Sequence, residues 1–144
     1  MDFRIENKNQ NERFRRLLNR LDSTQWQRDI GGGWTTGTMI CHLAFWEKMT
    51  SFRLKKWIET GTLAAVPDAD NILAINDSVR DVSTAIGFEA GSKLAIQAMD
   101  EIDGLVAGLD ESRLAELEKT GRERWFKRSL HRDTHLTRIE NTLA

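Results

Sequence analysis

Apolar side chains recur at helical spacing along almost the whole of this chain. The first stripe repeats at i, i+3, i+4 and i+7 and consists of Phe14, Leu17, Leu18 and Leu21. Such spacing places apolar residues on one face of a helix. No segment shows the strict alternation of a strand, and the single proline among the 144 residues is Pro67. The pattern therefore predicts an all-α fold.

Capping residues and glycines divide the pattern into separate helices. A second helix is expected to begin near Thr35 or Thr36, either of which can cap it, and to stop near Gly61. A third helical pattern contains Leu73, Asn76, Val79, Val82 and Ile86. The next helix carries one stripe formed by Leu94, Ala98, Ile102, Leu105 and Leu109.

The remaining quarter of the chain continues this alternation of helix and loop. Asp110 can cap a short further turn through Leu114 and Leu117, and the segment "KTGRER" is expected to be a loop. The last helix should hold Trp125 or Phe126 at its start and then continue through His131, His135 and Ile139.

Two segments are predicted to be connectors. No strand is expected before Gly31 to Gly33 and no GK[ST] follows them, so a flexible connector is the better interpretation than a phosphate-binding loop. The segment "GTLAAVPDAD" contains Pro67, which disfavours helix. Four main helices, with a fifth, shorter helix between the second and third long ones, predict a four-helix bundle in one domain spanning residues 1–144.

Composition makes several classes of protein a poor fit. The chain has 21 basic and 22 acidic side chains, so it lacks the basic excess expected of a nucleic-acid-binding protein. No apolar run reaches the ~18 residues of a membrane span, and the N-terminal segment lacks the apolar core of a signal peptide. A single cysteine, Cys41, cannot form an internal disulfide. A cytoplasmic location, without a nucleic-acid or membrane partner, is the default expectation.

The chain has three histidines, and two of them lie four residues apart in its last predicted helix. Residues at i and i+4 share a helix face with their Cβ atoms about 5–6 Å apart, so the rings of His131 and His135 can converge on one ion. His42 lies on the apolar side of the second helix, beside Leu43 and Trp46. If the bundle brings all three rings together, they form a three-nitrogen metal site with an open fourth position.

A solvated surface pair is the competing interpretation of His131 and His135. The segment "HRDTHLTRIE" is heavily charged, which favours that alternative. Two observations favour the metal site: the chain has no spare histidine, and Ile139 continues the stripe of the pair, so the pair should face inward.

Other side chains near these histidines have two interpretations each. Trp34 and Trp46 can wall a pocket or pack in the core, and Asn76 can orient a water or ligand or form a hydrogen bond in the core. Glu47 points away from His42, at about 500° around the helix, and Asp133 should face solvent; surface charge is favoured over a catalytic base for both. Cys41 is interpreted as a small buried residue rather than a nucleophile.

A basic stretch overlaps the last helix and consists of Arg122, Arg124, Lys127, Arg128 and Arg132. It can attract an anionic substrate, but a solvated helix face is the favoured explanation.

The segments "GGGWTTGTMICHLAFWEK" and "HRDTHLTRIE" resemble the DinB/YfiT-like family of four-helix-bundle proteins, over most of the chain. Trp34 and His42 match the W-(x7)-H signature of the family, and "HLAFWE" matches its H-L-x-x-W-E continuation. His131 and His135 match the C-terminal H-x-x-x-H, and Asn76 resembles an asparagine of the middle helical segment. The "IND" segment and the short length look closest to the ClbS/DfsB branch, which includes colibactin self-resistance and DfsB-type proteins.

This resemblance implies an up-down-down-up bundle in which His42, His131 and His135 hold a divalent metal, usually nickel or zinc. Relatives include transferases that use small thiols such as bacillithiol or mycothiol, and maleylpyruvate isomerases. The resemblance therefore leads us to expect a small-molecule substrate, a low-molecular-weight thiol as a possible cosubstrate, and a homodimer.

Three hypotheses follow from the sequence. The first is a metal-dependent enzyme, either a thiol-dependent transferase or a hydrolase. The second is a non-catalytic protein that binds or sequesters a small molecule for resistance. The third is a structural dimer, which a large apolar face left over after bundle assembly would support.

Overall fold

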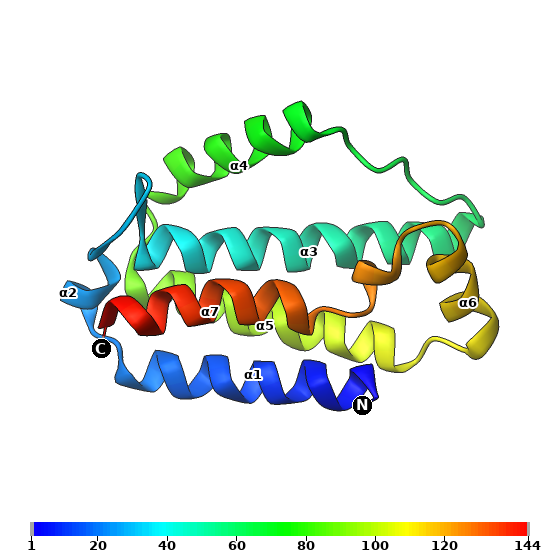
Figure 1. The fold of residues 1–144 in the computed structure, drawn as a ribbon, viewed down its shortest axis with the longest axis horizontal. Helices are drawn as coiled ribbons and strands as arrows, with labels where there is room; N and C mark the ends of the chain where they lie inside the picture. Colours follow the sequence, from blue (N-terminus) through cyan, green and yellow to red (C-terminus); the bar gives the residue numbers. More distant parts are fainter. Residues whose placement is uncertain (1, 144) are drawn as a thin grey trace.

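The computed structural model describes residues 2–143, and most of these residues are helical (Figure 1). The helices are α1 (Phe3–Arg20), α2 (Ser23–Trp26), α3 (Thr36–Thr60), α4 (Ala69–Ser83), α5 (Phe88–Ala107), α6 (Glu111–Lys119) and α7 (Ser129–Leu143), with a 3₁₀ turn η1 (Glu123–Trp125). Two short antiparallel strands, β1 (Asp29–Gly31) and β2 (Trp34–Thr35), precede α3. The expected all-α bundle is confirmed.

The long helices run in the order that the sequence resemblance implies. In Figure 1, α3 and α5 run in one direction, whereas α1 and α7 run in the other, which is an up-down-down-up bundle. The extra helix between the second and third long ones is α4, which lies along the outer side of α3. Within residues 2–143, none of the helices combines the length and apolar content that crossing a bilayer requires.

Both ends of α3 are fixed by the residues that the sequence indicated. Thr35 is the N-cap: its hydroxyl accepts from the Thr38 backbone N–H at 3.1 Å, and the Thr38 hydroxyl accepts from the Thr35 N–H at 2.9 Å. This reciprocal pair satisfies amides that have no partner within the helix. Gly61 ends the helix with φ 76°, a left-handed conformation that glycine adopts without strain.

The three consecutive glycines form an ordered hairpin, so their prediction as a flexible connector is wrong. Gly31, Gly32 and Gly33 all have positive φ, which lets the chain reverse between β1 and β2. The Arg138 guanidinium on α7 donates to the carbonyl oxygens of Gly31, at 2.6 Å, and Ile30, at 3.3 Å. The strands are too short to show alternation in the sequence, which is why they were not predicted.

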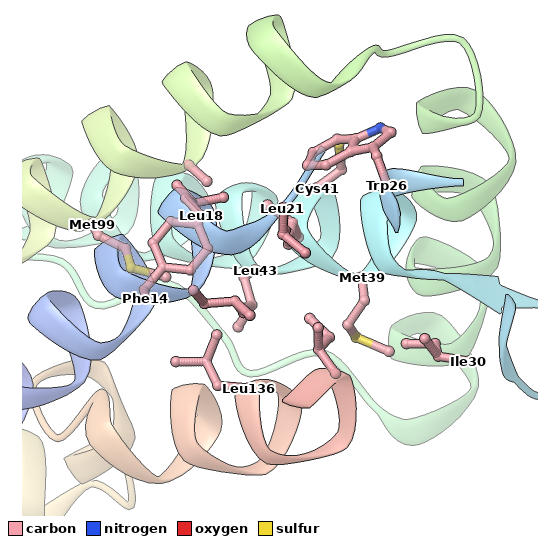
Figure 2. Close-up of a cluster of buried hydrophobic side chains, with 14 residues drawn as sticks. Phe14, Leu18, Leu21, Trp26, Ile30, Met39, Cys41, Leu43, Met99 and Leu136 are labelled. Atoms are coloured by element: carbon pink, nitrogen blue, oxygen red, sulfur yellow. The ribbon is translucent and has the colours of Figure 1, made fainter. Parts of the chain in front are cut away.

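The core consists of two apolar clusters that follow one another along α3. Figure 2 shows the first, where Phe14 of α1, Leu43 of α3, Met99 of α5 and Leu136 of α7 point toward one another. The second lies around Leu54, Trp57, Ile102, Val106 and Leu117. The buried positions on α3 between Leu43 and Leu54 are polar: Glu47, Thr50 and Ser51.

Two predicted helices differ in detail from the structure. The stripe predicted for α5 is confirmed in part. Ala98, Ile102 and Leu109 are buried as predicted, whereas Leu94 is 50% exposed and Leu105 is half-buried. The other buried positions of the helix are Gly91, Ala95, Met99 and Val106. The last helix begins at Ser129, not at Trp125 or Phe126. Trp125 ends η1 and Phe126 follows it, and both rings pack into the second cluster as a separate turn.

Candidate metal centre

Three imidazoles meet between α3 and α7. His42 comes from α3, and His131 and His135 are one turn apart on α7. The ring centroids lie 4.7 Å apart for His42 and His135, 4.7 Å for His131 and His135, and 5.3 Å for His42 and His131. His42 is buried and the other two are half-buried, so the C-terminal pair is not a solvated surface pair. The three residues predicted as ligands lie together.

The distance between one nitrogen of His42 and one of His131 fits tetrahedral coordination of a divalent ion. His42 Nε2 and His131 Nε2 lie 3.3 Å apart, and one nitrogen from each of the three rings lies within 4.8 Å of the others. Two zinc–nitrogen bonds of about 2.0–2.1 Å that meet at the tetrahedral angle place their nitrogens about 3.3–3.4 Å apart. Among the described residues, the buried Nδ1 atoms of His42 and His131 have no hydrogen-bond partner. The Nε2 atoms of His42 and His131 are the better placed ligands, because they lie at the distance that two nitrogens on one tetrahedral ion require.

All three rings are held in the neutral form that can bind a metal. Burial, with a contribution from His135, lowers the pKa of His42 to about 4. Burial and the neighbouring Arg128 guanidinium lower the pKa of His131 to about 2. The pKa of His135 is also lowered, by burial and by Arg138. Each ring keeps a free lone pair near neutral pH, and no proton has to be displaced before an ion binds.

A cavity of about 390 Å³ opens onto the three histidines. Its walls come from α3, from the segment that includes Val66 and Pro67, from α4, and from the chain around η1 and the start of α7. This volume lies within the usual range for small-molecule pockets. The site therefore combines three convergent nitrogens with room for a small organic molecule.

Two of the three predicted pocket residues line this cavity. Trp46 and Asn76 do so, and the Trp46 indole N–H donates to Asn76 Oδ1 at 2.7 Å, which links α3 to α4. Trp34 is not among the lining residues; its ring packs edge-on against His42, with the centroids 5.4 Å apart. Trp34 thus supports one ligand from behind, while Trp46 faces the cavity.

Comparison with known families places the chain in one superfamily. The sequence profile described as the DinB superfamily matches residues 7–143 of the chain. The chain belongs to the DinB superfamily. Searches of curated proteins and of solved structures returned no match. The profile match covers all three histidines of the cluster.

This DinB-superfamily chain contains a buried ion cluster that the sequence did not reveal. Glu47 is fully buried and accepts from Arg128 at 3.2 Å and from Arg132 at 3.0 Å. Arg132 is also fully buried and donates to Asp103 at 2.7 Å. Burial alone would raise the pKa of Glu47, but the two guanidiniums outweigh it and hold that pKa below its usual value. The prediction of Glu47 as surface charge is therefore wrong.

The prediction of the basic stretch as a solvated helix face is also wrong in part. Arg124 and Lys127 are exposed as expected, but Arg128 and Arg132 are buried in the ion cluster. A signal for both errors was present in the sequence. Glu47 lies four residues after Leu43 on the buried side of α3, and Arg132 precedes Leu136 by four residues on α7.

Asn7 completes the connections at the start of α7. Its side-chain oxygen accepts from the backbone N–H of Arg128 and Ser129, at 2.9 and 3.1 Å, and its amide donates to the Phe126 carbonyl at 2.8 Å. The Asn7 carbonyl accepts from Arg132 at 2.9 Å. α1 and α3 together therefore fix the first turns of the helix that carries two of the three histidines.

The remaining predicted residues lie as expected. Asp133 is exposed and pairs with Arg13 at 2.6 Å. Cys41 is buried in the first apolar cluster, and burial raises the pKa of its thiol to about 11. A thiol of this kind is a poor nucleophile near neutral pH, which agrees with its interpretation as a packing residue.

Proposed function

We propose that this DinB-superfamily chain binds one divalent ion, nickel or zinc, through His42, His131 and His135, and acts as a metal-dependent enzyme on a small molecule. The observation that carries the proposal is the convergence of three neutral imidazoles on the wall of a cavity, with one nitrogen pair at 3.3 Å and all three ligand atoms within 4.8 Å of one another. When bound, the ion would supply Lewis-acid chemistry and lower the pKa of a group that it coordinates.

The composition of the cavity favours a thiol-dependent transferase over a hydrolase. Hydrolysis normally uses a general base, commonly a histidine or carboxylate, within hydrogen-bond reach of the attacking water. The described residues that line the cavity include no aspartate or glutamate, and the buried Glu47 is held by two arginines. A small thiol is acidic enough to react as its thiolate without such a base. A low-molecular-weight thiol is therefore the proposed cosubstrate.

Metal analysis of single-residue variants tests the metal proposal. We expect the purified protein to contain about one divalent ion per chain, and His42→Ala to lose it because the site keeps two of its three ligands. Cys41→Ala is the matched control, since it changes the neighbouring position on α3 and should retain the ion. A stoichiometric ion retained in His42→Ala would contradict the ligand assignment.

The lack of a carboxylate in the cavity also supports a second candidate, a non-catalytic protein that sequesters a small molecule. Thiol-transfer assays on the metal-loaded protein separate the two candidates. Turnover that disappears in His42→Ala supports the enzyme. Stoichiometric binding of the small molecule without turnover supports sequestration.

We also propose a branch of the superfamily and an oligomeric state. Membership of the ClbS/DfsB branch is supported by the "IND" segment and the short length. Assembly as a homodimer is supported by large apolar side chains that remain exposed, namely Phe52, Leu73 and Val82. Sedimentation at several protein concentrations would test the dimer.

A further inference from the structure

The cavity at the histidines is rimmed by positive charge. The residues that line it include four cations, Arg53, Arg124, Lys127 and Arg128, and none of its lining residues in the described part of the chain is acidic. An isolated excess of one sign in a cavity attracts a ligand of the opposite sign, because low-dielectric walls focus the field. A cation of this set can bind such a ligand only if no carboxylate of the chain already pairs with it.

Two of the four cations already have partners. Arg128 is paired with Glu47, and Lys127 lies 3.2 Å from Glu123 and 3.8 Å from Glu118. Arg53 and Arg124 have no carboxylate within ion-pairing distance among residues 2–143. Arg124 is exposed to solvent, whereas Arg53 is half-buried. Among these four cations, Arg53 therefore has neither a carboxylate partner nor full exposure to solvent.

Two aromatic rings flank Arg53. Its guanidinium carbon lies 6.0 Å from the centroid of Trp46 and 5.8 Å from that of Trp125, both of which line the same cavity. Burial lowers the pKa of Arg53, although an arginine stays charged under ordinary conditions. A guanidinium flanked in this way keeps its fork of N–H donors available, and a carboxylate matches that fork with two parallel hydrogen bonds.

We propose that the cavity binds a small organic carboxylate, whose charge is held by Arg53 and whose apolar body packs against the cavity wall near Ile72, Trp125 and Leu130. This inference rests on the proposed function, because it names the class of molecule that the same site takes. A monoanion with an apolar body fits better than a polyphosphate, because one unpaired half-buried guanidinium lies among aromatic and aliphatic side chains.

Binding of a matched pair of probes tests the proposal. 4-Phenylbutyrate and 4-phenylbutanamide share an apolar body and differ in charge. We expect the acid to bind the full chain about tenfold more tightly than the amide, the gain typical of a bidentate charged contact. Quenching of tryptophan fluorescence measures both dissociation constants, because Trp46 and Trp125 lie beside Arg53, and calorimetry checks them.

Variants assign the preference to one residue. Arg53→Gln should abolish the difference between acid and amide, and Arg53→Lys should keep part of it. Arg113→Gln is the control, because Arg113 lies over Trp57 at 5.9 Å and does not line the cavity. Equal affinity for the two probes, including failure of both to bind, would overturn the proposal, as would an unchanged preference in Arg53→Gln.

Metal content measured on the same samples keeps this result separate from the metal proposal. A preference for the acid in protein that binds no ion would support the carboxylate site while contradicting the metal centre. Protein that contains one ion per chain but binds the acid and the amide equally would support the metal centre and contradict the carboxylate site.

Discussion

Glu47 is a single carboxylate that stabilises the packing of α3 against α7. It is fully buried and neutralised by Arg128 and Arg132, so its loss leaves two guanidiniums short of negative charge inside the bundle. We expect Glu47→Gln to lower the free energy of unfolding by about 3–5 kcal/mol, the cost of removing one partner of a buried ion pair. Urea unfolding of the metal-free protein measures this change.

The exposed Glu118, which lies 3.8 Å from Lys127, provides the comparison for Glu47. Glu118→Gln should change the free energy of unfolding by less than about 1 kcal/mol, because solvent screens a surface pair. A Glu47→Gln variant that is no less stable than Glu118→Gln would contradict the expectation that the two buried guanidiniums require this carboxylate.

The sequence allowed the three histidines to be predicted but not the ion cluster beside them. Imidazole at i and i+4 is a rare pattern in a chain with three histidines, so residue type and spacing were informative for His131 and His135. Charged residues such as Glu47 and Arg132 lie at the surface in most proteins. Their spacing to Leu43 and Leu136 indicates the buried face of each helix, but spacing within one helix does not identify the partners, which lie 81 to 85 residues away along the chain.

At the scale of the elements, Trp26 requires glycine on two neighbouring helices. A Cβ atom added at Gly91 of α5 would lie 2.4 Å from the Trp26 ring, and one added at Gly37 of α3 would lie 2.3 Å from it. At Gly37 and Gly91, both helices therefore approach α2 more closely than a residue with a Cβ atom would allow. The Trp26 indole N–H donates to the Ile86 carbonyl at 3.0 Å, which fixes the ring in this position.

Because of this contact, alanine substitutions at two glycines of α5 should change the stability of the protein in opposite directions. Gly91→Ala should destabilise the protein by about 1–3 kcal/mol, because the added methyl overpacks the core. Gly104 has no atom within 4 Å of an added Cβ, so Gly104→Ala should stabilise α5 by about 0.5–1 kcal/mol through helix propensity alone. Thermal unfolding of both variants measures whether each substitution destabilises or stabilises the protein. Destabilisation by Gly104→Ala as well would mean that the effect is a property of the helix and not of the Trp26 contact.

Element boundaries were predictable where one residue type enforces them. Thr35 and Gly61 bound α3 as expected, because a hydroxyl cap and a left-handed glycine act locally. The hairpin before α3 was missed because its strands have three and two residues. The predicted stripe of α5 was wrong at Leu94, which is apolar but exposed, because apolar residues at the surface are common.

At the scale of the whole molecule, the histidines make the stability of the metal-free protein depend on pH. Burial keeps the pKa of His42 at about 4 and that of His131 at about 2 in the folded state, whereas the unfolded chain protonates near the ordinary value of about 6.5. Between about pH 6.5 and pH 4 the unfolded state binds more protons, so stability is fully present above this window and is lost as the pH falls through it.

Urea unfolding of the metal-free protein across this window measures the dependence. We expect the midpoint to fall as the solution is acidified, and His42→Gln to show a smaller fall because it removes one of the buried imidazoles. An identical pH dependence in His42→Gln and the unaltered protein would contradict the contribution of His42. Carboxylates titrate in the same range but are shared by both proteins, so the difference between them isolates the histidine.

The separation of the three imidazoles along the chain also has a consequence for biosynthesis. A polypeptide is made in the direction from its N-terminus to its C-terminus, so His42 is polymerised 89 residues before His131. A nascent or truncated product that stops before α7 offers one imidazole and cannot chelate. Under the proposed function, acquisition of the ion is therefore coupled to the formation of α7, and a chain that lacks this helix does not compete for the metal.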